Sequence, residues 1–235
     1  MSSEPLLRLE NIEKRFGGLI VLHEQSFSVS AGEILGLVGP NGSGKTTTIN
    51  VISGVLRANS GRILFEGKEI RNQPIFRIAR LGINRSFQVP KCFRAMSARE
   101  NIEVAATFGA HAPVDVDAIL DEIGLLRHAG EPAGSLTVNQ QKMLDLGRAL
   151  ATNPRLLLID EIGAGLNPSE LGAIAALLKS LAARGIALIV VEHLLEFLNR
   201  ITDRVIVLGA GRMLFEGSLA EASRHPDVVA AFIGG

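Results

Sequence analysis

One segment of the sequence combines residue types that bind phosphate. It reads Gly39-Pro40-Asn41-Gly42-Ser43-Gly44-Lys45-Thr46-Thr47. Its glycines allow consecutive backbone N–H groups to converge on a phosphate, Lys45 can reach the outer phosphates, and the Thr46 hydroxyl can ligate Mg²⁺. An apolar strand over 34–38 leads into this loop, and a helix from 45 to about 53 follows it, so the helix N-terminus also favours an anion. The segment predicts a site for a nucleoside triphosphate such as ATP, held with Mg²⁺, rather than an ordinary glycine-rich turn.

A second segment supplies two adjacent acids after an apolar run. Residues 156–159 are all Leu or Ile, and Asp160 and Glu161 follow directly. Such a run has the length of a buried parallel strand, and ligands bind at the carboxyl edge of such sheets. Asp160 would hold Mg²⁺ through water, while Glu161 would orient or deprotonate the attacking water. Taken alone, an acidic pair after a strand is more often a turn or a helix cap; next to a phosphate loop we expect the catalytic role.

The elements around these segments predict an α/β fold with a parallel sheet. Residues 5–35 alternate in polarity with glycine breaks, which predicts an N-terminal antiparallel β-subdomain. Helical patterns dominate between 88 and 152, and strand–helix alternation returns from 156 onward. We therefore expect a single domain over 5–235. Its nucleotide-binding core with the β-subdomain spans 5–87 and 153–225, the inserted α-helical subdomain spans 88–152, and a tail helix spans 226–235.

Several helix boundaries can be read from local signals. Capping boxes begin helices after Ser97, with Glu100, and after Thr137, with Gln140. Asn167 followed by proline starts a helix that ends near 185. A strand over 186–191, a helix from His193 to 203 and a strand over 205–208 complete the pattern.

Composition restricts the classes of function. Formal net charge is zero, so a nucleic-acid partner gains no electrostatic support. No apolar run approaches the roughly 18–20 residues needed to span a bilayer. We expect no export signal, and the lone Cys92 cannot form an intramolecular disulfide; both fit a cytosolic location.

The order of motifs resembles the ATPases of ABC transporters over essentially the whole chain. Besides the phosphate loop and the acidic pair, Gln88 lies in Ser-Phe-Gln before the helical insertion, and His193 lies in Val-Val-Glu-His. The resemblance implies a P-loop NTPase core in which Gln88 senses Mg²⁺ and the attacking water, His193 contacts the γ-phosphate, and Phe16 stacks on adenine. Taken individually, Gln88 could be a surface residue, His193 the start of a helix and Phe16 part of the core.

Further motifs are similar to the ATP-binding subunits of branched-chain amino acid importers. They are Phe87-Gln88, Phe93, Met96-Ser-Ala-Arg-Glu-Asn-Ile102, Gly165-Leu-Asn-Pro168, Val191-Glu-His193 and the ending from His225 to Phe232. The resemblance implies two ATPase subunits, two membrane permeases and a substrate-binding protein, with this chain at the cytoplasmic face of a bacterial or archaeal membrane. Rival interpretations are an ATPase for urea, short amides or lipid, a soluble non-transport protein, and a nucleotide-binding regulator without turnover.

The signature sequence departs from that family's usual Leu-Ser-Gly-Gly-Gln. Here it reads Leu136-Thr137-Val138-Asn139-Gln140, and Ile162 replaces the usual proline after Glu161. Val138 and Asn139 add side chains where glycine lets backbone approach a partner's phosphate, and we expect Val138 to be strained because it adopts positive φ poorly. The site completed by this signature should hydrolyse slowly, which predicts a heterodimer with a second, different ATPase subunit.

Overall fold

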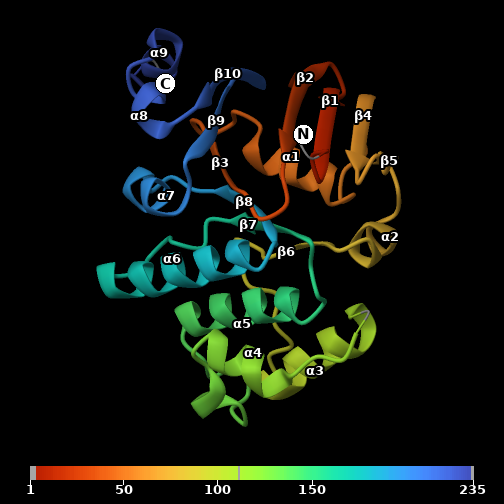
Figure 1. Cartoon of the computed structure of the whole chain (residues 1–235), viewed down its shortest axis with the longest axis vertical. Helices are drawn as coiled ribbons and strands as arrows, with labels where there is room; N and C mark the ends of the chain where they lie inside the picture. The colour runs from red at the N-terminus through yellow and green to blue at the C-terminus, as the bar shows by residue number, and fades with distance from the viewer. Residues whose placement is uncertain (1–3, 111, 234–235) are drawn as a thin grey trace.

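The larger sheet forms the centre of the molecule. The computed structural model describes residues 4–110 and 112–233, and Figure 1 shows their arrangement. Within them the strand order is β10-β9-β3-β8-β7-β6, formed by Arg212–Gly217, Arg204–Gly209, Ile34–Val38, Ala187–Val191, Leu156–Asp160 and Ile83–Arg85. The strands from β9 to β6 are parallel, as predicted, whereas β10 pairs antiparallel with β9 and adds an antiparallel edge.

A smaller antiparallel sheet packs beside it, as the alternating N-terminal pattern predicted. Its described strands run in the order β2-β1-β4-β5, formed by Leu19–Val29, Leu7–Phe16, Ser60–Phe65 and Lys68–Glu69. Gly17, at φ 58°, makes the turn between β1 and β2. The larger sheet is covered on both faces, because alternate residues of β7 enter different cores. Leu156 belongs to the core that contains Ile49, and Leu157 belongs to the core that contains Leu178.

Helices flank the sheet and form the insertion. Beside the sheet lie α1 (Lys45–Ile52), α2 (Ile75–Arg80), α6 (Pro168–Ala183), α7 (Leu195–Ile201), α8 (Leu219–Ala222) and α9 (Pro226–Ile233). The insertion contains α3 (Ala98–Gly109), α4 (Val116–Glu122), η1 (Leu126–His128) and α5 (Val138–Leu150), at the bottom of Figure 1. A Cβ on Gly147 of α5 would lie 2.5 Å from Ile123 Cδ1 and 3.0 Å from Ile102 Cδ1, so a small residue lets these helices pack closely.

The local start signals were mostly correct. The capping boxes of Ser97 and Thr137 are formed, and Asn167 caps α6 with Pro168 at its first position. The helix predicted from His193 to 203 is shorter, because Leu194 is extended and α7 spans only Leu195–Ile201. His193 therefore lies in the connection between β8 and α7 and not in a helix. Across the described ranges, we find no helix with both the length and the apolar character needed to cross a bilayer.

Candidate nucleotide-binding and hydrolysis site

The glycine-rich loop begins where β3 ends and leads into α1. Gly39, Gly42 and Gly44 have φ values of 152°, 77° and 105°, which residues with side chains rarely adopt. A Cβ on Gly39 would lie 2.2 Å from the carbonyl oxygen of Leu208, so this glycine also permits close packing on β9. A Cβ on Gly42 would meet nothing within 4 Å. The loop is therefore tight against the sheet at one end and open at its tip.

Lys45 is buried at the start of α1. Its Nζ donates to the carbonyl oxygens of Gly39 at 2.7 Å and Pro40 at 2.9 Å, so the ammonium folds back along the loop. Burial lowers the pKa of Lys45, whereas the carboxylates of Glu161 and Asp160 raise it. A phosphate would supply a second source of negative charge beside this desolvated cation.

A cavity of about 170 Å³ brings the loop together with the two predicted catalytic side chains. Its lining residues are Val21, Asn41, Gly42, Gly44, Lys45, Thr46, Thr47, Glu161 and His193. Thr46 is exposed. The predicted phosphate-binding residues and the predicted hydrolytic residues therefore face the same space, although they lie far apart in the sequence.

Glu161 lies at the meeting point of three segments. Its Oε2 accepts a hydrogen bond from Gln88 Nε2 at 2.7 Å, and its Oε1 lies 2.9 Å from His193 Nε2. These partners are 73 and 32 residues away in the sequence. Its backbone N–H donates to the carbonyl of Val191 at 2.9 Å, which ties the end of β7 to the end of β8. One carboxylate is thus held between the glutamine and the histidine that the sequence singled out.

The backbone of Glu161 is left-handed, with φ 53°. Such a conformation is uncommon for a residue with a side chain and occurs mainly where surrounding contacts enforce it. A proline at the next position would push its predecessor toward extended conformations. Ile162, buried in the core, does not impose that restriction. The replacement noted in the sequence therefore leaves Glu161 free to adopt the conformation that it has.

Asp160 has a buried carboxylate oxygen that could ligate a cation. It is buried, its Oδ1 has no hydrogen-bond partner among the described residues, and its Oδ2 lies 3.7 Å from Arg85 Nη2. Burial raises the pKa of Asp160, and Arg85 acts against this shift. Ser43 Oγ in the loop is likewise buried and without a partner in the described chain. The carboxylate oxygen of Asp160 fits a hydrated cation, and the hydroxyl of Ser43 can donate to a phosphate.

Phe16 is placed apart from that cavity. It ends β1, is 47% exposed, and carries the Lys14 ammonium 4.7 Å from its ring centroid. An exposed ring is available for stacking, so the core alternative is wrong. Its role toward adenine stays a prediction.

The signature segment lies at the N-terminus of α5 and does not line the cavity. Leu136 is buried, Thr137 caps the helix, and Val138 is 66% exposed. Asn139 Nδ2 donates to Glu170 Oε1 at 3.2 Å. Both substituted positions belong to the first turn of the helix, and neither has positive φ. The strain predicted for Val138 is therefore wrong, because a helical position suits it; only the bulk of the two side chains remains as an obstacle.

Some residues that organise the site were missed by sequence reasoning. Asp145, 4% exposed, accepts hydrogen bonds from the backbone N–H groups of Phe87 at 2.7 Å and Lys91 at 3.3 Å, and so holds the segment that contains Gln88. Arg85 faces Asp160 from β6. Neither has a spacing that distinguishes it from an ordinary surface charge. Glu192 could have been noticed, because it is an acid that directly follows a buried strand.

Comparisons with known proteins agree with this arrangement. The sequence profile of the family described as "ABC transporter" matches residues 22–164. The chain is 31% identical to the high-affinity branched-chain amino acid transport ATP-binding protein BraF of Pseudomonas aeruginosa, over 99% of each chain. It is also similar to a crystal structure of the ADP conformation of an ATP-binding cassette of an ABC transporter, with 34% identity, a TM-score of 0.88, and 99% of this chain and 100% of that one covered.

A further solved structure is a dimeric ATP-binding cassette in a post-hydrolysis state bound to ADP and phosphate. It is 25% identical, with a TM-score of 0.82, and the match covers 91% of this chain and 98% of that one. The family profile spans more than half of this chain, and the relative from Pseudomonas aeruginosa is similar over nearly its full length. The chain is therefore a nucleotide-binding ATPase that belongs to the ABC transporter family.

Proposed function

We propose that this chain binds ATP with Mg²⁺ and hydrolyses ATP to energise an importer of branched-chain or related amino acids. The observation that carries the proposal is the Glu161 carboxylate, held by Gln88 at 2.7 Å and near His193 at 2.9 Å beside the phosphate-loop cavity. The amino-acid cargo is supported by the similarity to BraF and related transport ATP-binding proteins.

In the proposed reaction Glu161 acts as the general base. Its carboxylate orients and deprotonates a water for attack on the γ-phosphate, while the His193 imidazole contacts that phosphate. Lys45 and the backbone N–H groups of the loop bind the phosphates. Thr46, Asp160 and Gln88 would hold Mg²⁺, directly or through water, and the ion would neutralise charge on the phosphates.

The working assembly is proposed to contain two ATPase subunits. The signature segment from Leu136 to Gln140 lies away from the cavity of its own chain, so we place it against the nucleotide of the second subunit. The similar dimeric cassette with ADP and phosphate supports such pairing. Because Val138 and Asn139 replace glycines, we propose a heterodimer docked peripherally on permease subunits at the cytoplasmic membrane face. A substrate-binding protein would act indirectly through those permeases.

The decisive experiment replaces Glu161 by glutamine. Glu161→Gln keeps the size and hydrogen bonding of the side chain and removes the base, so single-turnover ATP hydrolysis should fall by roughly 100-fold or more while ATP binding persists. Glu196→Gln, at an exposed acid in the first turn of α7, is the matched control and should retain the wild-type rate. Near-normal hydrolysis by the Glu161 variant would remove this residue from the mechanism.

A further inference from the structure

Glu192 is a buried acid with no role in the reaction described so far. It follows β8 directly, precedes His193 and is 1% exposed, whereas the His193 side chain is 45% exposed. Neighbouring side chains at the end of a strand point in opposite directions, so His193 faces the cavity and Glu192 faces the interior. A buried carboxylate is costly unless it is hydrogen-bonded, and its partners therefore indicate what it does.

The groups that stabilise the Glu192 carboxylate are backbone N–H groups beside the catalytic side chains. Its Oε1 accepts from the backbone N–H of Gly163 at 2.6 Å. The backbone N–H of His193 also interacts with this carboxylate and lowers its pKa. Burial raises the pKa of Glu192, and these two backbone N–H groups act against the shift. The carboxylate thus connects the loop that follows Glu161 to the residue that contacts Glu161 from β8.

The contact between Glu192 and Gly163 is closely packed. A Cβ on Gly163 would lie 3.1 Å from Glu192 Oε1, 3.1 Å from Leu171 Cδ2 and 3.3 Å from Leu194 Cδ1. Gly163 does not have positive φ, so glycine is needed there for space and not for backbone conformation. A Cβ at this position would therefore require the carboxylate or the neighbouring leucines to shift by a few tenths of an ångström.

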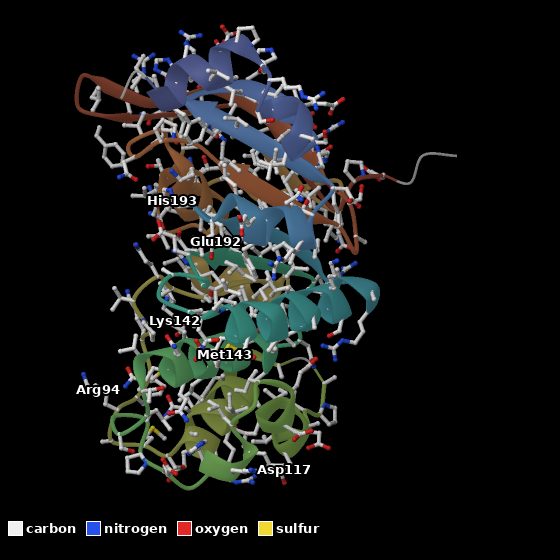
Figure 2. The ribbon with its side chains drawn as sticks, turned by 90° about the vertical axis from the view of Figure 1, so that its left-hand side faces the viewer. Arg94, Asp117, Lys142, Met143, Glu192 and His193 are labelled. Carbon is white, nitrogen blue, oxygen red and sulfur yellow. The ribbon has the colours of Figure 1, made fainter. Side chains whose placement is uncertain are left out.

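A positively charged side chain of α5, that of Lys142, binds the same loop. Lys142 Nζ donates to the carbonyl oxygen of Ala164 at 2.6 Å and lies 3.5 Å from that of Glu161. Lys142 also acts electrostatically on Glu192. In Figure 2 the labelled residues His193, Glu192 and Lys142 follow one another down one side of the molecule. An anion therefore binds an N–H group of loop 161–165, and a cation binds its carbonyl groups.

We propose that Glu192 is a positioning residue for ATP hydrolysis, whose carboxylate fixes the loop after Glu161 against the backbone of His193. Glu192 thereby keeps the Glu161 and His193 side chains in contact. Its loss should leave the phosphate loop, and with it ATP binding, unchanged. The inference rests on the proposed function, because it requires Glu161 to act in hydrolysis. Glu192 itself does not line the cavity, so it acts on the reaction only through its neighbours.

The first test compares two glutamine variants of the full chain. Glu192→Gln has the same size but lacks the charge, and its NH₂ group cannot accept a hydrogen bond. We expect single-turnover hydrolysis to fall about tenfold, the scale of one lost charge-assisted hydrogen bond, with the ATP dissociation constant within about twofold of wild type. The matched control is Glu33→Gln, because Glu33 also accepts a backbone N–H, that of Ser30 at 2.8 Å, but lies at the amino end of β3. A Glu192 variant no slower than this control would overturn the inference.

The second test asks whether Glu192 acts through Glu161. If it does, adding Glu192→Gln to Glu161→Gln should slow hydrolysis by less than about twofold further, because the base is already gone. A full, independent tenfold loss in the double variant would overturn the inference, since it would indicate general damage to the fold.

A third variant disturbs the same contact from the other side. Gly163→Ala keeps the Glu192 charge but crowds its carboxylate, so it should also lower the rate of hydrolysis without changing ATP affinity. An unchanged rate contradicts the proposal even if Glu192→Gln fails to fold. Failure of the proposed function would give a different result. In that case the wild-type chain would not hydrolyse ATP, or Glu161→Gln would hydrolyse ATP at the wild-type rate.

Discussion

The two residues that replace glycine in the signature allow a prediction in which activity and stability change in opposite directions. We consider Val138→Gly combined with Asn139→Gly in the chain purified alone. Any dimer of identical chains must use this signature at both sites, so the wild-type protein should hydrolyse ATP slowly. Removing both side chains opens the first turn of α5 to a partner's phosphate, because backbone N–H groups can then approach it closely. We expect the ATPase rate to rise at least about tenfold.

The cost in stability follows from the structure. Replacing Val138 and Asn139 by glycine costs about 0.3 kcal/mol each in helix propensity, because both residues are themselves poorer helix formers than alanine. Loss of the hydrogen bond from Asn139 Nδ2 to Glu170 Oε1 costs roughly 0.5–1.5 kcal/mol more. Val138 is 66% exposed, so little apolar burial is lost with it. The sum is roughly 1–2 kcal/mol, which corresponds to a melting temperature lower by roughly 2–8 °C for a domain of this size.

The assay measures steady-state phosphate release per chain together with thermal unfolding. Val138→Ala with Asn139→Ala is the matched control, because alanine removes most of the bulk and keeps the helix propensity. This pair should show a smaller rise in rate and a smaller loss of stability than the glycine pair. Vigorous hydrolysis by the wild-type chain alone, unchanged in a folded glycine variant, would refute the proposed obstruction and with it the reason to expect a heterodimer.

Two further predictions concern nucleotide binding and docking. Lys45→Ala should abolish hydrolysis and weaken ATP binding at least tenfold by calorimetry while the fold is retained, because the contacts of Lys45 Nζ are to its own loop; normal ATP affinity would contradict its role. Val89→Cys, at a side chain 74% exposed beside Gln88, should crosslink to a permease in the assembled complex. The native Cys92 should react little, because burial raises the pKa of Cys92 to about 11 and only ~0.1% of that thiol is ionised at pH 8. Tight binding of the purified chain to protein-free liposomes would instead indicate attachment through lipid.

Sequence reasoning succeeded where the relevant signal is local. The apolar runs of β3, β7 and β8 are buried along their whole length, so their composition alone identified them as central parallel strands. The capping residues Ser97, Thr137 and Asn167 each bond within three residues, which is why these helix starts were predictable. By contrast, β6 has three residues and no distinctive pattern, and it was not anticipated.

The contacts that organise the site could not be read from spacing. Gln88 and Glu161 are joined across 73 residues, and Asp145 and Phe87 across 58. Such contacts depend on how the insertion packs on the sheet. The family resemblance indicated that Gln88, Glu161 and His193 belong together, but not that Glu161 has a left-handed backbone or that a buried Glu192 binds the loop after it. The strain expected for Val138 failed for a similar reason, because its backbone conformation is set by the helix that Thr137 caps.

Helix α5 connects the two functional ends of the molecule. Its first turn presents Thr137 and the substituted signature away from the chain's own cavity. One turn later Lys142 binds the carbonyl groups after Asp160, and after it Asp145 binds the backbone of the segment that carries Gln88. Both contacts are made to backbone, so they do not depend on which side chains the two loops carry. Because the same helix carries the signature and contacts both the loop of Glu161 and the segment of Gln88, a displacement of its N-terminus must be accommodated at the Glu161 carboxylate and at its partner Gln88.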